Sequence, residues 1–462
     1  MTALQLNDEG RTPLFETQSL ALLKSALRRL EEGSPTLPSF QASVDLQALE
    51  EILHQVADRM TDNYPYAHPY YAGQMLKPPH AVARLAYTLA LWINPNNHAL
   101  DGGRASSNME REAVHAIANM FGWQSYLGHL TSGGTMANLE ALWVAGQLHP
   151  NKKVIASAQS HYTHQRISGV LQLPYQSVPV DGAGRMDMQA LQHILQQEQD
   201  GVAVVVATLG TTAIGSVDPL SQILDLQAQY GFRVHVDAAY GGYFALAEGL
   251  SETTRLAFDA IAQADSVVID PHKHGLQPYG CGCVLFKDAT VGQLYKHDSP
   301  YTYFTSDELH LGEISLECSR AGASAVALWA TQQLLPMVKG GQFAQDLGAS
   351  LRAARTLHQK LQLDGRFVLP LLPELDIVVW GIRAERTSEM NQHAQRFFDE
   401  AAQQHLHLAL TRLSSDYFRG IDGVEIDTDQ VVCLRSCLMK AEHLDWLDEI
   451  VNIIITVANQ LL

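Results

Sequence analysis

The sequence predicts an α/β protein with a mostly parallel central sheet covered by helices on both faces, followed by a smaller C-terminal α+β domain. Short runs rich in Val, Ile and Ala, among them "KVIASA", "VAVVVATLG", "FRVHVDAAY", "DSVVID" and "GCVLF", alternate with helical or irregular segments. Near-continuous apolar strands separated by helices are typical of a parallel sheet with both faces buried. After Arg320 a long helical stretch leaves this sheet, and "FVLPLL", "DIVVWGI" and "VVCLRSCLM" then alternate with helices.

The N-terminal part of the chain is expected to be helical. "SLALLKSALRRLEEG" and "DLQALEEILHQVADRM" have the apolar spacing of amphipathic helices. The tyrosine-rich stretch "YPYAHPYYAGQMLKPPH" then interrupts regular structure with Pro and Gly, and "NMEREAVHAIANMFGW" is helical again. We therefore divide the chain into an N-terminal helical segment (1–75), a large α/β domain (76–335) and a small α+β domain (336–462).

Composition excludes several classes of partner. The 462 residues carry a formal net charge of −18, with 31 basic against 49 acidic side chains, which argues against nucleic acid. No basic region followed by an apolar run opens the sequence, and the late stretch "IVNIIITVANQLL" is too short and too polar to span a bilayer. Five cysteines without a CxxC pair favour reduced thiols, a cytoplasmic location and no metal site.

Polar residues collect where neighbouring strands end, which is where open α/β sheets bind ligands. "HVDAAY" ends one strand with Asp237, and "VIDPHKHG" places Lys273 after the next, 36 residues later, enough for one strand–helix–strand unit. "TSGGTMAN" is a Gly-rich turn that opens a helix, where free N–H groups and the helix dipole favour a phosphate. A phosphate cradle, a lysine and a buried carboxylate in one cleft are what pyridoxal 5′-phosphate requires.

The strand that follows Lys273 has two glycines. In "GCGCVLF", Gly280 and Gly282 predict that the backbone of this strand passes close to the cofactor or to the neighbouring subunit. Cys281 and Cys283 lie two residues apart, so their side chains are expected on one face of the strand.

The stretches TSGGT-x-AN, S-H-Y, A-T-L-G-T-T, H-V-D-A-A-Y and D-P-H-K, in this order, resemble the group II pyridoxal-phosphate-dependent amino-acid decarboxylases. That family includes glutamate, aromatic-amino-acid, diaminobutyrate and archaeal tyrosine/aspartate decarboxylases. The resemblance covers roughly residues 60–330 well and the C-terminal domain more loosely. It implies the fold type I of pyridoxal-phosphate enzymes, an L-amino acid as substrate, an amine and CO2 as products, and a homodimer with its sites at the subunit interface.

The resemblance also assigns roles to individual residues. Lys273 would form the Schiff base, Asp237 would pair with the pyridine nitrogen, and His161 of S-H-Y would stack on the cofactor ring. Further contacts to the phosphate and the ring are implied for Gly134, Thr135, Thr212, Ala239, His272 and Ser319, the last of these often reached from the partner subunit.

The proton donor and the substrate contacts are expected on three further segments. In the family a loop tyrosine after the lysine protonates the α-carbon, and "KHDSPYTYFTSDELHLG" offers Tyr301 and Tyr303 without a choice between them. "HPYYAGQML", with Tyr71 and Gln74, and the strand with Arg435 correspond to segments that line the substrate. A buried amide at Gln74 favours a polar substrate, because an unmet hydrogen bond would cost roughly 1–3 kcal/mol. Acidic or diamino substrates are therefore favoured over aromatic ones.

Three alternative interpretations remain. A pyridoxal-phosphate-dependent carbon–carbon lyase of the sphingoid-phosphate-lyase type also has a His-Lys pair at its Schiff base, but such lyases usually carry a membrane anchor. A metal-dependent hydrolase would use Asp237, Asp270, His272 and His274, with both histidines on one face of a strand, and would leave Lys273 unexplained. A binding protein without activity would not need the lysine, the aspartate and the histidine together.

Overall fold

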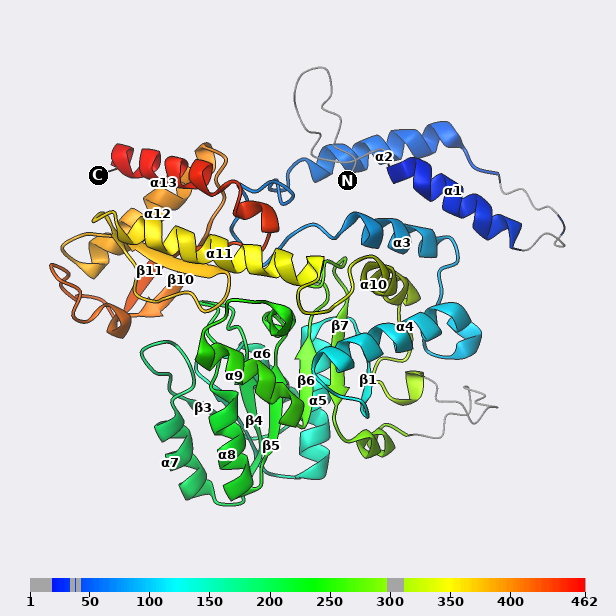
Figure 1. The fold of residues 1–462 in the computed structure, drawn as a ribbon, viewed down its shortest axis with the longest axis horizontal. Coiled ribbons are helices and arrows are strands. Elements are labelled where there is room, and N and C mark those ends of the chain that lie inside the picture. Colours follow the sequence, from blue (N-terminus) through cyan, green and yellow to red (C-terminus); the bar gives the residue numbers. More distant parts are fainter. Residues whose placement is uncertain (1–18, 34–37, 39–42, 297–310, 462) are drawn as a thin grey trace.

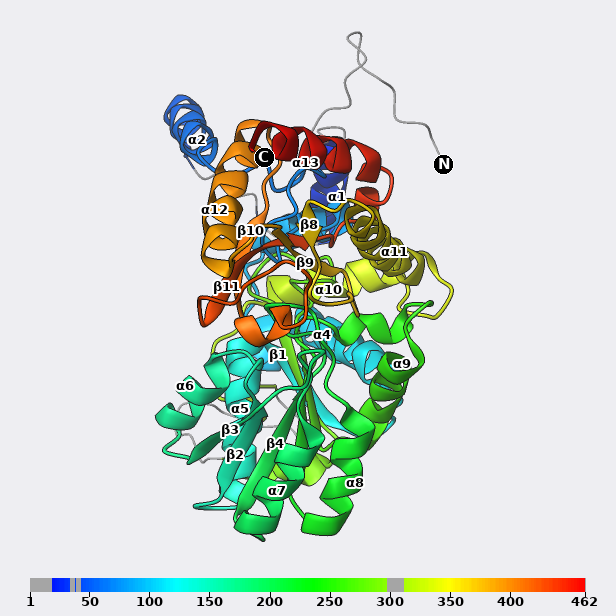
Figure 2. The same cartoon turned by 90° about the vertical axis from the view of Figure 1, so that its left-hand side faces the viewer.

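The computed structural model describes residues 19–33, 38, 43–296 and 311–461, and it has the expected α/β architecture (Figure 1). The central sheet has seven strands in the order β1-β7-β6-β5-β4-β2-β3. Only β7 runs antiparallel to its neighbours β1 and β6, and all other pairs are parallel. Figure 2 shows α5 and α6 on one side of this sheet and α8 and α9 on the other. The mostly parallel, doubly covered sheet is therefore confirmed.

The strands are short and the helices between them are of moderate length. The strands are β1 (Leu127–Thr131), β2 (Lys153–Ser157), β3 (Tyr175–Val178), β4 (Val202–Thr208), β5 (Arg233–Asp237), β6 (Ser266–Ile269) and β7 (Gly282–Phe286). The helices around them are α3 (Ala81–Leu91), α4 (Leu100–Met120), α5 (Gly134–Leu148), α6 (Thr163–Val170), α7 (Met188–Glu198), α8 (Leu220–Tyr230), α9 (Glu252–Asp259) and α10 (Gly322–Leu334). Every residue of β4 is buried, which explains its unbroken apolar sequence.

The C-terminal part forms a smaller antiparallel sheet in the order β10-β11-β9-β8. Its elements are α11 (Gln342–Gln362), β8 (Phe367–Val368), β9 (Ile377–Ile382), α12 (Thr387–Gln403), β10 (Ala409–Ser414), β11 (Gln430–Cys437) and α13 (Leu447–Leu461). The long helical stretch expected after Arg320 is in fact two helices, because Pro336 and the pair Gly340–Gly341 lie between α10 and α11.

The two N-terminal helices are confirmed as α1 (Ser19–Glu32) and α2 (Leu46–Met60). The Asp45 side chain caps α2 by accepting hydrogen bonds from the N–H groups of Gln47 and Ala48. No residue of α2 is buried, and Figure 2 shows the helix projecting at one side of the molecule. Among the described residues, no helix combines the length and hydropathy needed to cross a bilayer.

The glycines before and within β7 serve two different purposes. A Cβ at Gly282 would lie 2.5 Å from the carbonyl carbon of Gly133 and 2.6 Å from Thr131 Oγ1, so β7 packs directly against the "TSGGT" turn. The sequence predicted that the backbone here passes close to the cofactor or to the neighbouring subunit, whereas the close neighbour of Gly282 is this turn of the same chain. A Cβ at Gly280 would meet no atom within 4 Å, but the φ of this residue is +91°, so glycine is needed there for the backbone conformation.

We expect Gly282→Ala to lower the free energy of unfolding by about 1–3 kcal/mol, because the added methyl group must displace the backbone of the "TSGGT" turn. Urea denaturation followed by circular dichroism measures the change. Gly169→Ala is the control, because Gly169 is exposed near the end of α6 and a Cβ there meets nothing within 4 Å. An unchanged unfolding midpoint for Gly282→Ala would show that the turn can shift without a loss of stability, which would contradict this prediction.

Candidate active site

A cavity of about 280 Å³ lies at the carboxyl edge of the central sheet, beyond the ends of β4, β5 and β6. This is where the sequence placed the cofactor. The cavity is lined by most of the residues expected to contact it, namely Gly134, Thr135, His161, Thr212, Asp237, Ala239, His272 and Lys273.

Lys273 lies in a tight turn after β6 and reaches into this cavity. Its Nζ is 3.1 Å from Oδ2 of Asp270, and Nε2 of His272 lies 3.5 Å from the same oxygen. A Cβ at Gly134 would lie only 2.6 Å from that oxygen, so no larger residue fits at the start of α5. The buried carboxylate of Asp270 therefore holds the lysine amine beside the "TSGGT" turn.

Asp237 ends β5 and is almost completely buried. Its Oδ1 accepts a hydrogen bond from the N–H of Ala239 (3.1 Å), and its Oδ2 accepts from Nε2 of His164 (2.8 Å). Burial pushes the pKa of Asp237 upward, but the hydrogen bond and charge of His164, together with Lys273, outweigh it and hold that pKa well below its usual range. Asp237 is thus a carboxylate, the state that a protonated ring nitrogen requires.

Sequence reasoning missed the residues that support Asp237. Asn138 Nδ2 lies 3.4 Å from Asp237 Oδ2, and Asn138 Oδ1 pairs with Nε2 of the buried His235 (2.8 Å). Burial lowers the pKa of His235 to about 3, so this imidazole is neutral. A signal was available for Asn138, because it follows Gly134 by four residues, which places both on one face of α5.

His161 lines the cavity as a half-buried ring, and its Nδ1 shares a hydrogen bond with Thr163 Oγ1 (2.7 Å). Burial lowers the pKa of His161, only partly opposed by Asp237. A neutral imidazole in this place suits stacking on an aromatic ring.

The amino end of α5 opens on the cavity without a side-chain cap. Its first N–H groups are therefore available to an anion, and the helix dipole favours negative charge there. One N–H of the preceding turn, that of Ser132, already donates to Oε2 of Glu317 (2.9 Å). The uncapped helix, the amine of Lys273 and the carboxylate of Asp237 fit pyridoxal 5′-phosphate.

The three residues expected to contact substrate form one connected group beside the cavity. Arg435 is buried and donates through Nη1 to the carbonyl of Thr212 (3.0 Å) and through Nη2 to Oε1 of Gln74 (2.7 Å). The N–H of Gln74 donates to the hydroxyl of Tyr71 (3.2 Å). The expectation of a buried amide at Gln74 is wrong, because this residue is exposed and its side-chain oxygen is satisfied by Arg435.

Other expected residues lie elsewhere. Ser319 is exposed, accepts a hydrogen bond from Asn96 Nδ2 (3.2 Å) and does not line the cavity of this chain. Tyr301 and Tyr303 fall outside the described residues.

The geometry expected for a hydrolase is wrong. His272 and His274 lie in a turn rather than a strand, and they line two different cavities. The described part of the chain also holds no group of three His, Cys, Asp or Glu residues arranged for a metal ion.

Comparison with known proteins decides the family. Residues 136–383 match the family described as "Pyridoxal-dependent decarboxylase conserved domain". The chain belongs to this family. It is a pyridoxal-phosphate-dependent amino-acid decarboxylase.

This decarboxylase is similar to curated enzymes with different substrates in their names. An "L-tyrosine decarboxylase" of Enterococcus faecium is 28% identical over 490 residues, covering 82% of this chain and 80% of that protein. A "Probable L-tyrosine/L-aspartate decarboxylase" of Methanothermobacter thermautotrophicus is 27% identical over 314 residues, covering 67% and 82%.

The fold is also found in solved structures. The glutamate decarboxylase domain of a diaminobutyrate-pyruvate transaminase and L-2,4-diaminobutyrate decarboxylase from Vibrio parahaemolyticus superposes with a TM-score of 0.72 at 19% identity, covering 98% of each chain. At this identity the likeness concerns the fold alone, and it confirms the expected fold type I.

We expect His164→Phe to weaken binding of pyridoxal phosphate to the apo-decarboxylase roughly 10- to 100-fold, because a hydrogen bond to a charged group contributes about 1.5–3 kcal/mol. Without that donor, burial raises the pKa of Asp237 and its charge is lost more readily. Titration of the apoenzyme with cofactor, followed by absorbance, measures the affinity. His164→Gln keeps an N–H donor and should recover part of the loss, whereas equal affinities in both variants would contradict this role.

Proposed function

We propose that Lys273 forms the Schiff base with the cofactor in this decarboxylase and that the substrate is an L-amino acid with an acidic side chain. One observation supports the assignment of Lys273 as the Schiff-base lysine. The amine of Lys273 shares a single cavity with the buried carboxylate of Asp237 and the uncapped amino end of α5. No other lysine lines that cavity among the described residues.

When bound, pyridoxal 5′-phosphate supplies an electron sink for the electrons released as the bond to the α-carboxylate breaks. The residues of the chain set the conditions for this chemistry. The N–H groups of α5 would hold the phosphate, and the negative charge of Asp237 would keep a proton on the ring nitrogen. His161 would cover one face of the ring and exclude water. Tyr301 and Tyr303 remain the predicted donors of a proton to the α-carbon.

Arg435 supports an acidic substrate. A buried cation is unfavourable unless an anion pairs with it. The guanidinium of Arg435 donates to two neutral acceptors, and its buried Nε has no acceptor among the described residues. A side-chain carboxylate would supply the missing negative charge.

The other substrate classes fit Arg435 less well. A diamino side chain, which the sequence also favoured, would bring a second cation to this place, and a tyrosine side chain would leave the guanidinium without an anion. The names of the relatives include tyrosine, aspartate and diaminobutyrate, so they do not select one class of substrate side chain. The inference of an acidic substrate therefore rests on Arg435.

We expect CO2 release to be fastest from L-aspartate or L-glutamate, by about ten-fold or more over L-2,4-diaminobutyrate and L-tyrosine. Release of labelled CO2 from each carboxyl-labelled amino acid measures this. Lys273→Ala should abolish release from all four, whereas Lys287→Ala, at an exposed lysine after β7, should not change it. Faster release from tyrosine would overturn the substrate class, and no release from any amino acid would favour the carbon–carbon lyase.

We propose further that the enzyme is a homodimer in which α2 packs on the second subunit. Leu49, Ile52, Leu53, Val56 and Met60 recur at helical spacing and form one apolar stripe. Between 46% and 63% of each of these side chains is exposed in the single chain. A contiguous apolar stripe on a helix that buries nothing else suits an interface with a second copy.

We expect the parent enzyme to sediment as a dimer and the double variant Ile52→Asp/Val56→Asp to sediment as a monomer, because both charges fall within the apolar stripe. Sedimentation velocity at several protein concentrations separates the two states. Glu50→Gln, on the same helix, is the control and should remain dimeric. A fully active parent monomer would contradict the proposal.

A further inference from the structure

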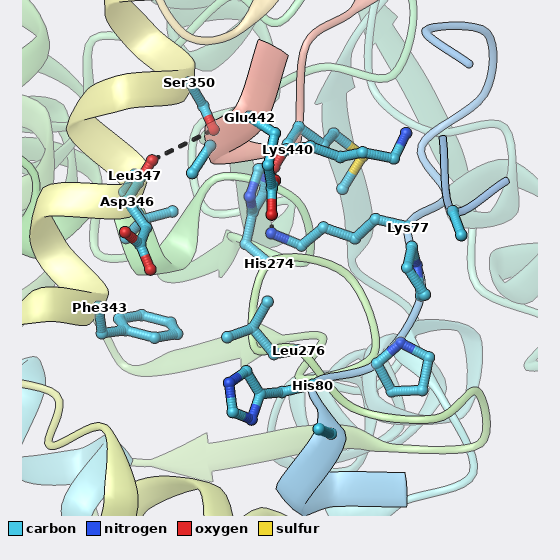
Figure 3. Close-up of a pocket in the computed structure, with 16 residues that line it drawn as sticks. Lys77, His80, His274, Leu276, Phe343, Asp346, Leu347, Ser350, Lys440 and Glu442 are labelled. Atoms are coloured by element: carbon cyan, nitrogen blue, oxygen red, sulfur yellow. Dashed lines mark hydrogen bonds between the residues drawn. The ribbon is translucent and has the colours of Figure 1, made fainter. Parts of the chain in front are cut away.

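A second cavity, of about 300 Å³, lies behind the turn that carries Lys273. Its walls come from the segment before α3, the first turns of α11, residues 274–276 and residues 439–442 (Figure 3). It shares no lining residue with the candidate active site. The family chemistry described above makes no use of it.

Opposite charges face each other across this cavity. Figure 3 shows Lys77 reaching into it from one wall and Asp346 of α11 on the other. Nζ of Lys77 donates to the carbonyl of Met439 (3.1 Å), which leaves two of its three N–H groups for a ligand. Oδ1 of Asp346 accepts from Nε2 of Gln342 (2.8 Å), and the carboxylate keeps further acceptor sites.

An apolar wall and a buried imidazole complete the cavity. The side chains of Phe343 and Leu276 line the cavity below the two charged groups in the view of Figure 3. His274 is fully buried, and its Nδ1 has no hydrogen-bond partner among the described residues. The cavity is thus lined by two lysines (Lys77 and Lys440), two carboxylates (Asp346 and Glu442), a hydrogen-bonding imidazole and a hydrophobic surface. The amine of Lys440 donates to the carbonyl of Tyr71 (2.6 Å), so Lys77 is the cation considered for a ligand.

Lys77 keeps its charge despite its surroundings. Burial lowers the pKa of Lys77 to about 8, against the opposing effect of Asp376, Glu442 and Asp346. At pH 7 about nine in ten of these amines are therefore protonated. An incoming carboxylate would strengthen the protonated state, because it adds a negative charge next to the ammonium group.

The two cavities meet at one short segment of backbone. Lys273 lines the candidate active site, whereas His274 and Leu276 line the second cavity. Leu276 has a φ of 63°, a left-handed backbone conformation that is unusual for a bulky residue. Backbone strain of this kind is often found at functional sites. Its carbonyl accepts a hydrogen bond from the N–H of His80 (2.9 Å), which ties this segment to the wall of the second cavity. A ligand there would contact the segment that positions Lys273.

We propose that the second cavity is an effector site for a free amino acid with an aliphatic side chain, coupled to Lys273 through residues 274–276. The ligand carboxylate would pair with Lys77, its ammonium group with Asp346, and its side chain would lie against Phe343 and Leu276. The charges on the two walls select a zwitterion over a simple anion or cation. An aliphatic amino acid lacks the carboxylate expected of the substrate, so the two sites differ in specificity.

Calorimetric titration with L-leucine tests the binding. The holoenzyme is first reduced with borohydride, so that no amine can exchange at the cofactor. We expect about one leucine per chain for the parent, and an affinity that falls at least ten-fold in Lys77→Gln and in Asp346→Asn. Acetate and methylamine, each carrying one of the two charges, should bind at least ten-fold more weakly than leucine.

Matched variants and a rate measurement complete the test. Lys77→Arg keeps the charge and should still bind leucine. Asp399→Asn should also still bind leucine, because Asp399 accepts a hydrogen bond from Gln395 of its own helix just as Asp346 accepts one from Gln342.

In the unreduced enzyme, leucine should change the rate of CO2 release at least two-fold in the parent and should not change it in Lys77→Gln or Asp346→Asn. If no leucine binding is detected at about 10 mM, or if Lys77→Gln and Asp346→Asn both bind leucine as tightly as the parent, the proposed site is wrong. Binding without a change in rate would overturn the coupling. The calorimetric result does not depend on which amino acid is the substrate.

Discussion

The contact between Asp270 and the start of α5 is the constraint on which the candidate active site depends. One oxygen of this buried carboxylate meets Lys273 and His272, and it occupies the place where any side chain at position 134 would lie. Gly282 of β7 also packs closely against the backbone of the "TSGGT" turn. This turn therefore cannot move without disturbing the lysine. The glycines of "TSGGT" and "GCGCVLF" are needed for this close packing.

Asp237 illustrates how the fold overcomes the unfavourable effect of burying a charge. Its carboxylate has almost no contact with water, which by itself favours protonation. The hydrogen bonds from His164 and from the Ala239 N–H reverse that preference. These partners are themselves buried, so the network is already oriented before a cofactor arrives. Preorganised partners of this kind lose little entropy when a ligand binds, which favours tight cofactor binding.

The sequence predicted those parts of the fold that local patterns determine. The buried strands β4 and β6 are nearly continuous apolar runs, whereas β5 ("RVHVD") alternates valine with polar residues. The polar residues at the ends of these strands had to meet at one edge of the sheet. Strand β3 escaped prediction because it lies at the sheet edge and "YQSV" is mostly polar. The exposure of Gln74 could not be predicted either, because it depends on Arg435, which lies 361 residues further along the chain. Contacts of this range leave no periodic signal in the sequence.

The small C-terminal domain is joined to the Lys273 turn by a buried polar contact. Asp376, just before β9, accepts a hydrogen bond from the hydroxyl of Tyr240 (2.6 Å), and its other oxygen lies 3.2 Å from Nε2 of His274. Asp376 and His274 are fully buried, and the pKa of Asp376 is held below its usual value, because attraction and hydrogen bonding from His274 and Tyr240 outweigh burial. Removing Tyr240 or His274 by mutation would leave this buried carboxylate without one of its partners, at a cost of about 1–3 kcal/mol. The small domain is therefore part of the structure that positions the lysine. The second cavity lies beside this joint, where a bound ligand would contact both domains at once.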